Sequence, residues 1–375
     1  MLIILVTVIF SLSAFAVMLL IPKILLISTR KRLLDIPNKR KVHTAISSRL
    51  GGAAFYPGII LPLFLSIGIY SLIDSQIWNI TITPWLLLTI AATQVMYIVG
   101  IIDDIIHLRY GTKFICQLFA AMIVLISGSW VNDLYGFLGI HTLPVYIGMM
   151  LTLFLTIFII NSINLIDGID GLASGLSVIA LLCFAIIFYI DGQVSPLLLS
   201  IATLGTLLAF FRYNVWGLPN KSTKIFMGDS GSLIIGIIIS SLAFKLCFKD
   251  NSVVIKNAPY NLFIAYSVLI IPCFDVVQVV FHRLKNKQRL FHPDKNHFHH
   301  KLLTLGLSPH QALIAILGCS IGFILLNMLL EPFISMEVIM ALDVTLWILI
   351  HIKISHLIRN KVYPAKKNIN QKHNL

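Results

Sequence analysis

Charged residues are scarce in this sequence. Asp, Glu, Lys and Arg make up 11% of its 375 residues, whereas hydrophobic residues make up 58%. A soluble domain carries roughly 25% charged residues, so a soluble fold of this length could not bury so much apolar side chain. The composition therefore predicts a protein whose solvent is lipid. The formal net charge of +13 does not indicate a nucleic-acid partner, because the basic residues lie in short segments between apolar runs.

Two further features are missing, and each absence excludes a class of protein. The five cysteines form no C-x-x-C pair and lie in or beside apolar segments, so they indicate buried small side chains rather than a disulfide framework. No basic residue precedes Lys23, and the first basic cluster follows the apolar run, at Arg30, Lys31 and Arg32. A secretory signal has the opposite order of charge, so we expect this run to be a first transmembrane helix.

Long apolar runs, by contrast, are abundant. A run of about 17 to 25 apolar residues is long enough to span a bilayer as a helix. Eleven such runs occur, at about residues 3–27, 51–73, 84–103, 113–130, 144–161, 175–191, 195–211, 229–247, 261–281, 310–330 and 336–357. They predict an all-α polytopic integral membrane protein with about eleven transmembrane helices, ten being possible. Short linkers predict a single membrane domain over residues 1–357 and a basic tail over 358–375.

The distribution of Lys and Arg predicts the orientation. If the N-terminus lies outside, the segments that face the cytoplasm hold 23 of the 28 basic residues. Positive charge accumulates on the cytoplasmic side of membrane proteins, so the N-terminus is predicted to be periplasmic and the C-terminus cytoplasmic. This assignment places five polar clusters on the cytoplasmic side.

The first polar cluster is Gly100-Ile-Ile-Asp103-Asp104, followed by Lys113. Adjacent aspartates at the end of a helix can serve as metal ligand and base. Two carboxylates this close repel each other unless a cation lies between them or nearby. Solvated charge at a helix end is the alternative interpretation.

The second cluster follows the fifth apolar run and contains Asn161, Asn164, Asp167 and Asp170, interleaved with glycine. Spacings of three place Asn161, Asn164 and Asp167 on one face of a helical turn. Amide and carboxylate oxygens are hard ligands, suited to Mg²⁺ or Mn²⁺. A simple polar turn would not explain so many oxygens after an apolar helix.

The third cluster, Phe226-Met-Gly228-Asp229-Ser-Gly-Ser, opens the predicted helix at 229. Free backbone N–H groups at a helix N-terminus attract phosphate, and Asp229 could hold a bridging cation. Asp229 and the serines could instead be ordinary helix caps.

The fourth cluster joins Arg283 to His297, His299 and His300. A zinc site is possible, but no cysteine is near and adjacent histidines do not readily point at one ion. A loop that grips pyrophosphate with cationic and imidazole donors fits better. Asp275 lies in the preceding apolar run, where an ionisable group is costly and usually functional.

The fifth cluster lies between the first two apolar runs and contains His43, Arg49, Gly51 and Gly52. Its basic residues also satisfy the charge bias that sets the orientation. The glycine pair suggests close backbone packing or close approach to a ligand.

Together the clusters supply Asp, Asn, cations and glycine turns on one membrane face, but no evident Ser or Cys nucleophile. This set suits phosphoryl transfer, in which cations neutralise developing charge. A site at the membrane surface suits one water-soluble and one lipid-borne substrate.

The motifs G-I-I-D-D, N-x-x-N-x-x-D-G-x-D-G, F-M-G-D-S-G-S and H-P-D-K-N-H-F-H-H-K-L resemble those of the polyprenyl-phosphate N-acetylhexosamine-1-phosphate transferases, in order, from about Asp35 to Leu307. The last motif is similar to the branch that uses UDP-GlcNAc and undecaprenyl phosphate. The phospho-MurNAc-pentapeptide transferases, a second branch, usually have three consecutive histidines, which Phe298 interrupts here. Ile46-Ser-Ser departs from the proline that many relatives have before the arginine.

The resemblance implies a role for each matching residue. It places Mg²⁺, with Mn²⁺ possible, on Asp229 and Asn164, and the lipid phosphate near Asp103, Asp104 and Lys113. The nucleotide pocket would contain Phe226, Asp170, Asp167, Asn161 and Gly228. The pyrophosphate or sugar would be held by His297, His299, His300 and Arg283. His43, Arg49, Gly51, Gly52 and Asp275 are further candidates.

The expected reaction transfers a HexNAc-1-phosphate, GlcNAc being the first choice, from a UDP-sugar to undecaprenyl phosphate with release of UMP. It would be the first lipid-linked step of cell-surface polysaccharide assembly, at the cytoplasmic face of a bacterial inner membrane, and a homodimer is possible. The alternatives are a 6-deoxy-HexNAc or GalNAc substrate, the phospho-MurNAc-pentapeptide reaction, an inactive scaffold, and a transporter or flippase of lipid-linked sugars. A transporter usually places its site near the bilayer midplane.

Overall fold

The computed structural model describes residues 2–31, 33, 47–73, 81–218, 223–248, 258–287 and 296–362. His43 and residues 363–375 of the expected basic tail lie outside these ranges. Within them the protein is helical, and pairing between extended segments is limited to two isolated bridges, Ser48 with Ile225 and Asp133 with Thr142. The all-α prediction is therefore confirmed.

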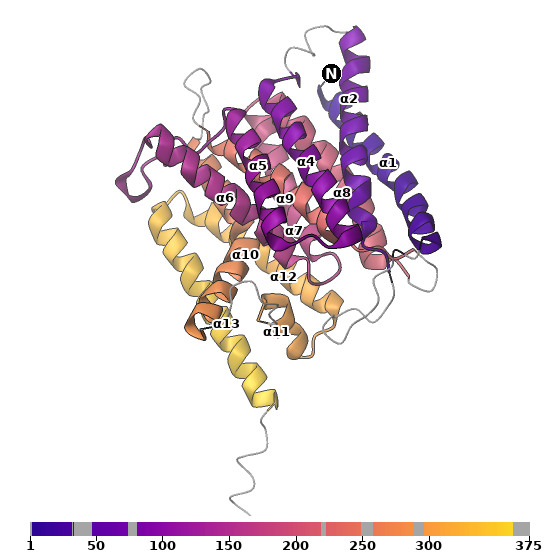
Figure 1. Ribbon diagram of the computed structural model, residues 1–375. Helices are drawn as coiled ribbons and strands as arrows, with labels where there is room; N and C mark the ends of the chain where they lie inside the picture. The colour runs from indigo at the N-terminus through magenta and orange to yellow at the C-terminus, as the bar shows by residue number, and fades with distance from the viewer. Residues whose placement is uncertain are drawn as a thin grey trace, which may run out of the picture. The chain divides into compact units, whose positions relative to one another are not determined.

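Every apolar run that was expected to cross the membrane forms a helix (Figure 1). The helices are α1 (Leu2–Arg30), α2 (Phe55–Ile73), α4 (Pro84–Ile106), α5 (Tyr110–Ile126), α6 (Val145–Ile166), α7 (Leu172–Ile190), α8 (Val194–Trp216), α9 (Gly228–Cys247), α10 (Ala258–Lys285), α12 (Pro309–Leu330) and α13 (Met336–Val362). Ten of the described helical segments are long and apolar enough to cross a membrane, and α5 is an apolar helix of 17 residues. The protein is thus a multi-pass membrane protein, and its described residues contain ten such helices and a shorter eleventh.

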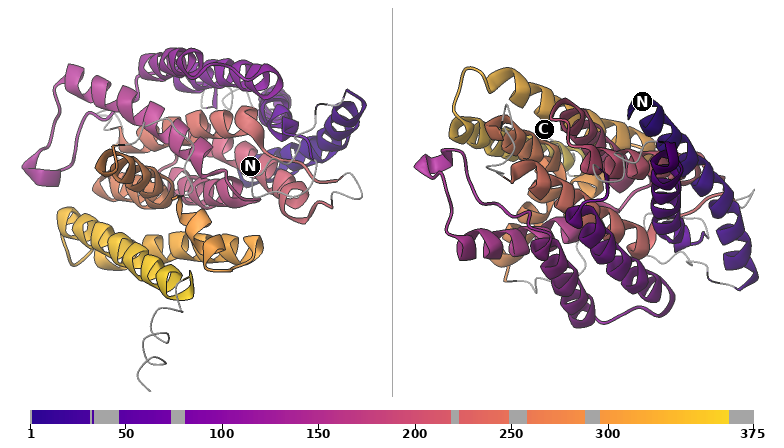
Figure 2. Two further views of the ribbon diagram at one scale, coloured as in Figure 1. Left: turned by 60° about the horizontal axis from the view of Figure 1, so that its bottom comes forward. Right: turned by 90° about the horizontal axis from the view of Figure 1, so that it is seen from above.

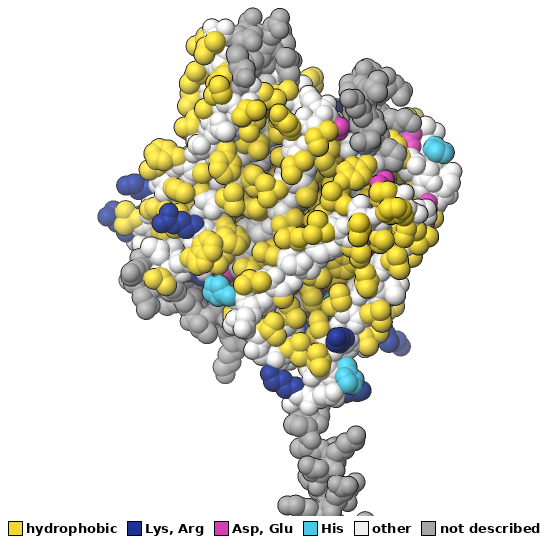
Figure 3. Space-filling view, turned by 180° about the vertical axis from the view of Figure 1, so that it is seen from behind, with side chains coloured by type: hydrophobic (Ala, Val, Ile, Leu, Met, Phe, Trp, Pro, Cys, Tyr) yellow, Lys and Arg dark blue, Asp and Glu magenta, His cyan; other side chains and the backbone are white. Residues whose placement is uncertain are grey.

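Hydrophobic side chains cover most of the face drawn in Figure 3, and charged side chains lie at its margins. Leu61, Ile115 and Phe154 are each about two-thirds exposed. Side chains of this kind are costly in water and are expected where a helix contacts lipid. The surface therefore agrees with the composition.

The contacts divide the chain into two compact units, Met1–Cys273 and Phe274–Leu375, with the boundary inside α10. In the first unit α9 is the central helix: nearly all of its apolar stretch is buried, whereas most of that of α1 is exposed. It packs against α4, α6 and α7. Close packing of α4 on α9 depends on Gly100, where a Cβ would overlap the backbone of Ser230. The helix that opens with the Gly228-Asp229 motif is therefore the core of this unit.

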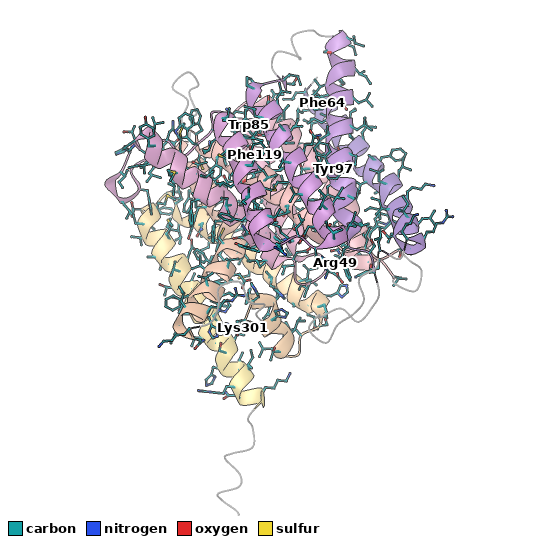
Figure 4. All side chains as sticks on the ribbon, viewed as in Figure 1. Arg49, Phe64, Trp85, Tyr97, Phe119 and Lys301 are labelled. Atoms are coloured by element: carbon teal, nitrogen blue, oxygen red, sulfur yellow. The ribbon has the colours of Figure 1, made fainter. Side chains whose placement is uncertain are left out.

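At one edge of the first unit, α1 packs against α2 and α8 (Figure 2). The 3-10 turn η1 (Leu50–Ala54) precedes α2 and contacts α9. Arg49, just before η1, lies at the end of the unit opposite Trp85 and Phe64 (Figure 4). Trp85 is in the first turn of α4, so Asp103, near the other end of that helix, lies toward the end marked by Arg49.

The second unit contains the end of α10, the short helix α11 (Phe298–Thr304), α12 and α13. A capping box starts α12: the Ser308 hydroxyl accepts from the N–H of Gln311, and the Gln311 side chain accepts from the N–H of Ser308. Such reciprocal caps fix where a helix begins. The helix α13 continues to Val362, so the first residues of the expected tail are helical.

Candidate functional site

Four helix ends of the first unit bring polar side chains into direct contact. Asp103 lies near the end of α4, Lys113 in the first turns of α5, Asn164 near the end of α6 and Asp229 in the first turn of α9. The helices alternate in direction along the chain. The ends of α4 and α6 therefore lie at the same end of the bundle as the starts of α5 and α9. The chemistry therefore gathers at one end of the bundle, as the alternating topology requires.

Lys113 lies between two carboxylates. Its Nζ is 2.6 Å from Oδ2 of Asp103 and 2.6 Å from Oδ2 of Asp229. Oδ1 of the buried Asp103 accepts a hydrogen bond of 2.7 Å from the backbone N–H of Leu108. The ammonium between them offsets the repulsion of the two carboxylates, although its single charge balances only one of them. The cation that the sequence required near Asp103 is thus Lys113.

Asn164 completes this cluster. Its Nδ2 donates to Oδ1 of Asp229 at 2.7 Å and to Oγ of Ser232 at 2.8 Å. Ser232 lies one turn after Asp229 on α9. The amide is thereby fixed beside the carboxylate, and the contact with Ser232 was not foreseen in the sequence.

Asp104 has a different environment from its neighbour. Its two oxygens accept the backbone N–H groups of Asp229, at 2.7 Å, and Ser230, at 3.0 Å. These N–H groups belong to the first turn of α9, where backbone N–H groups have no acceptor within the helix. Asp104 is therefore a cap supplied by another helix, and those two N–H groups are not available to a phosphate.

The Asn161 side chain faces a different helix. Its Nδ2 donates to Oε1 of Gln117 on α5 at 2.8 Å and to the carbonyl oxygen of Ile157 at 2.8 Å. The spacing of three suggested that Asn161, Asn164 and Asp167 act together. The structure gives Asn161 a structural amide pair between α5 and α6 and gives Asn164 the contact with Asp229.

Asp167 and Asp170 lie in the turn between α6 and α7. Burial raises the pKa of Asp167 to about 8, and the nearby carboxylates of Asp170, Asp229 and Asp104 act in the same direction. Asp170 forms an ion pair of 2.6 Å with Nζ of Lys224. Lys224 lies two residues before the half-buried Phe226, so the ion pair joins this turn to the segment that leads into α9. Lys224 lies just before the motif that begins at Phe226 and was not among the expected site residues.

The segment before α2 and the segment before α9 are held together by their backbones. The N–H of Phe226 donates to Ser48 O, that of Gly51 to Phe226 O and that of Gly52 to Met227 O, at 2.8 to 3.0 Å. A Cβ at Gly52 would overlap the backbone nitrogen of Gly231. The glycine pair therefore serves close packing of two backbones.

Gly228 is required for a related reason. Its φ is +71°, and a Cβ there would overlap the carbonyl oxygen of the half-buried Arg49 and crowd the Asp104 carboxylate. Only glycine adopts this conformation readily. Gly228 thus allows α9 to start directly against Asp104.

The histidine cluster belongs to the second unit. Nδ1 of His297 lies 2.7 Å from Oδ2 of the fully buried Asp275. The rings of His299 and His300 are 4.2 Å apart. Burial, with His300 and His297 nearby, lowers the pKa of His299 to about 2, so this ring is neutral. Arg283, on α10, is also buried. The fourth cluster is therefore a packed group in which His299 is enclosed and uncharged.

Asn164 and Asp229 could hold a magnesium ion. Both side chains carry hard oxygen atoms, and the two side chains are in contact, with Nδ2 of Asn164 2.7 Å from Oδ1 of Asp229. Mg²⁺ at phosphate-transfer sites uses one or two carboxylates, water and substrate phosphate oxygens. Among the described residues no group of three or more His, Cys, Asp or Glu could hold a metal ion. The chemistry of the Asn164–Asp229 pair therefore suits Mg²⁺ shared with a ligand.

Comparisons with known proteins agree with this arrangement. Residues 85–247 match glycosyl transferase family 4, and this segment contains Asp103, Lys113, Asn164 and Asp229. A probable undecaprenyl-phosphate N-acetylglucosaminyl 1-phosphate transferase of Bacillus subtilis is 32% identical over 90% of this chain and 86% of its own.

Two further relatives carry related names. A decaprenyl-phosphate N-acetylglucosaminephosphotransferase of Mycobacterium tuberculosis is 31% identical over 80% of this chain and 76% of its own. The undecaprenyl-phosphate alpha-N-acetylglucosaminyl 1-phosphate transferase of Escherichia coli K12 is 28% identical over 76% and 72%. The resemblance drawn from the motifs is confirmed, and the chain is a transferase that belongs to glycosyl transferase family 4.

Proposed function

We propose that this protein transfers GlcNAc-1-phosphate from UDP-GlcNAc to undecaprenyl phosphate, releasing UMP and forming undecaprenyl-diphosphate-GlcNAc at the cytoplasmic face of a bacterial inner membrane. The observation that carries the proposal is the contact of Lys113 with both Asp103 and Asp229, beside Asn164. The relatives' names supply the choice of sugar and lipid.

In the proposed reaction an oxygen of the lipid phosphate attacks the β-phosphorus of UDP-GlcNAc. The bond from that phosphorus to the bridging oxygen breaks, and the oxygen leaves with UMP. A phosphate monoester is already largely ionised at neutral pH, so no residue has to remove a proton first. Asp103, whose oxygens are held by Leu108 and Lys113, then acts by orienting Lys113.

Lys113 is the group in this cluster that can neutralise charge on the transferring phosphate. Its side chain is 24% exposed, so the ammonium is not closed off from a bound phosphate. A divalent ion held by Asn164 and Asp229 would supply further neutralisation to the phosphates when bound. The Asp170–Lys224 pair and Phe226 would form the uridine pocket, and the histidine cluster would contact pyrophosphate or sugar.

The test uses purified protein, undecaprenyl phosphate and a panel of UDP-sugars, with UMP release measured with Mg²⁺, with Mn²⁺ and with chelator. The proposal expects release with UDP-GlcNAc that depends on the lipid and on the metal. If UMP is released only with another UDP-HexNAc or with UDP-MurNAc-pentapeptide, that compound and not UDP-GlcNAc is the donor substrate. No release with any sugar would favour a transporter or scaffold.

A further inference from the structure

Asp275 is a fully buried carboxylate within the apolar helix α10, and both of its oxygens are used. Oδ2 lies 2.7 Å from Nδ1 of His297, and Oδ1 accepts the backbone N–H of Phe298 at 2.7 Å. A carboxylate in such a place is costly and is retained for a purpose. Here it binds two consecutive residues that lie more than twenty positions further along the chain.

The contact with Asp275 determines which nitrogen of His297 can meet a ligand. A ring nitrogen that donates to a carboxylate fixes the tautomer and the rotation of the imidazole. Because Nδ1 is engaged, Nε2 is the nitrogen left to bind, as an acceptor in the neutral ring or as a donor in the protonated one. The same logic holds for histidines whose other nitrogen binds a metal.

Residues on α13 hold the other side of this segment. The ring of Phe298 packs edge-on against Trp347 at 5.1 Å and lies 5.0 Å from the ring of His351. Nζ of Lys301 lies 3.0 Å from Nδ1 of His351. The start of α11 is therefore held by Asp275 on one side and by α13 on the other, and His297 lies at that point.

We propose that Asp275 is a positioning residue for the transfer reaction: by binding Nδ1 of His297 and the N–H of Phe298, it presents Nε2 of His297 to the anionic substrate in one orientation. This inference rests on the proposed function. It assigns Asp275 no contact with substrate, so its effect on activity passes through His297.

The test is a double-mutant cycle on Asp275→Asn and His297→Ala in the full-length protein, with UMP release from UDP-GlcNAc as the measurement. Asparagine can still accept from Phe298 but offers an N–H to His297, which favours the other tautomer. We expect Asp275→Asn to lower kcat/KM by about 10- to 100-fold, the usual effect of removing a partner that orients a histidine. In a chain that already carries His297→Ala, Asp275→Asn should have little further effect. Effects that multiply would overturn the proposal.

Asp343→Asn is the matched control, because Asp343 is also fully buried in the second unit and accepts from Nδ2 of Asn327 at 3.0 Å. It should leave kcat/KM near the wild-type value. An equal loss in both variants would mean that any buried carboxylate of this unit matters, and would contradict the specific role of Asp275.

Two substitutions of His297 test the roles of its Nδ1 and Nε2 separately and leave Asp275 unchanged. His297→Asn places an N–H near the position of Nδ1 and should keep the thermal midpoint while losing activity. His297→Gln reaches toward the position of Nε2 and should keep more activity at a lower midpoint. The reverse order would overturn the assignment.

A spectroscopic measurement separates this inference from the proposed function. Nitrogen-15 spectra of histidine-labelled protein should show a protonated Nδ1 for His297, which Asp275→Asn removes. Loss of that signal together with no UMP release from the wild type would reject the substrate assignment alone. An unchanged signal would reject the Asp275–His297 pairing whatever the activity.

Discussion

The ammonium of Lys113 lies 2.6 Å from a carboxylate oxygen of Asp229, and its second partner, Asp103, comes from a different helix. One side chain on α5 therefore ties α4 to α9. It also offsets the repulsion between two acids. Removing the cation should affect both the stability of this helix end and the transfer of phosphate.

Lys113→Met tests that dual role. The side chains of Lys113 and Asp229 are 24% and 31% exposed, so water screens part of the interaction. We expect a loss of stability on the order of 1–3 kcal/mol, less than for a fully buried pair, and a larger loss of activity. Thermal unfolding in detergent and UMP release measure the two effects. Lys113→Arg should recover stability more than activity. Full activity in Lys113→Met would contradict the role in neutralising phosphate.

Asp229→Asn should remove most of the turnover while the protein still inserts in the membrane. The amide removes the charge that pairs with Lys113 and the carboxylate proposed to share a metal ion. Loss of one electrostatic group at a transfer site lowers kcat by about 10²- to 10³-fold. Asp191→Asn is the control, because Asp191 also accepts from an asparagine, Asn261, at 2.8 Å, but lies at the end of α7 away from the cluster. Wild-type activity in Asp229→Asn would overturn the metal assignment.

Variants of Asp104 can distinguish a role in capping α9 from a direct role in the transfer reaction. If its purpose is to accept the N–H groups of Asp229 and Ser230, Asp104→Ala should lower stability by about 1–3 kcal/mol. Asp104→Asn keeps one acceptor and should retain part of both stability and activity. A direct part in the chemistry would instead make Asp104→Asn as inactive as Asp229→Asn while its thermal midpoint stays unchanged. Comparing the midpoint with UMP release in each variant decides between the two.

Gly52→Ala should destabilise the first unit through a steric overlap. The added methyl would meet the backbone of Gly231 at the start of α9, and overpacking of this kind typically costs about 1–3 kcal/mol. Gly68→Ala is the matched control, because Gly68 lies within α2 and a Cβ there has open space. That substitution should be neutral or slightly stabilising, since alanine is the better helix former. Equal midpoints for both variants would mean that the η1–α9 contact can relax.

Much of the fold and part of the candidate site could be read from the sequence. Every apolar run became a helix, because a chain in lipid must satisfy its backbone hydrogen bonds within each spanning segment. Alternating helix direction then brought Asp103, Asn164 and Asp229 to one end. The pairing of side chains could not be read in the same way. Lys113 was expected to bind phosphate, but only the packing of α5 against its neighbours sets it between two carboxylates.

The same limit explains the residues whose contacts were not foreseen. Asn161 and Asn164 are three residues apart, which offsets them by about 60° around α6. The first therefore reaches Gln117 on α5 and the second Asp229 on α9. The adjacent acids Asp103 and Asp104 likewise differ, because successive residues of a helix point about 100° apart. Spacing identifies a polar helix end, and tertiary packing assigns each member its partner.

Asp167 predicts a dependence of stability on pH. Its pKa is raised to about 8 by burial and by neighbouring carboxylates, whereas in the unfolded chain it has the ordinary value near 4. Between about pH 4 and pH 8 the folded state holds a proton that the unfolded state has lost. Stability therefore falls as pH rises through this window, by at most about 1.4 kcal/mol per pH unit.

Asp167→Asn removes this titration and leaves the other acids in place. The thermal midpoint of the wild type, measured from pH 5 to pH 8 without divalent metal, should fall relative to that of Asp167→Asn, with the gap widening toward pH 8. The amide cannot ionise, so the variant escapes the cost of placing a carboxylate beside Asp170, Asp229 and Asp104. Parallel curves would show that Asp167 is already ionised at pH 5, and hence that its surroundings are more hydrated than the structure indicates.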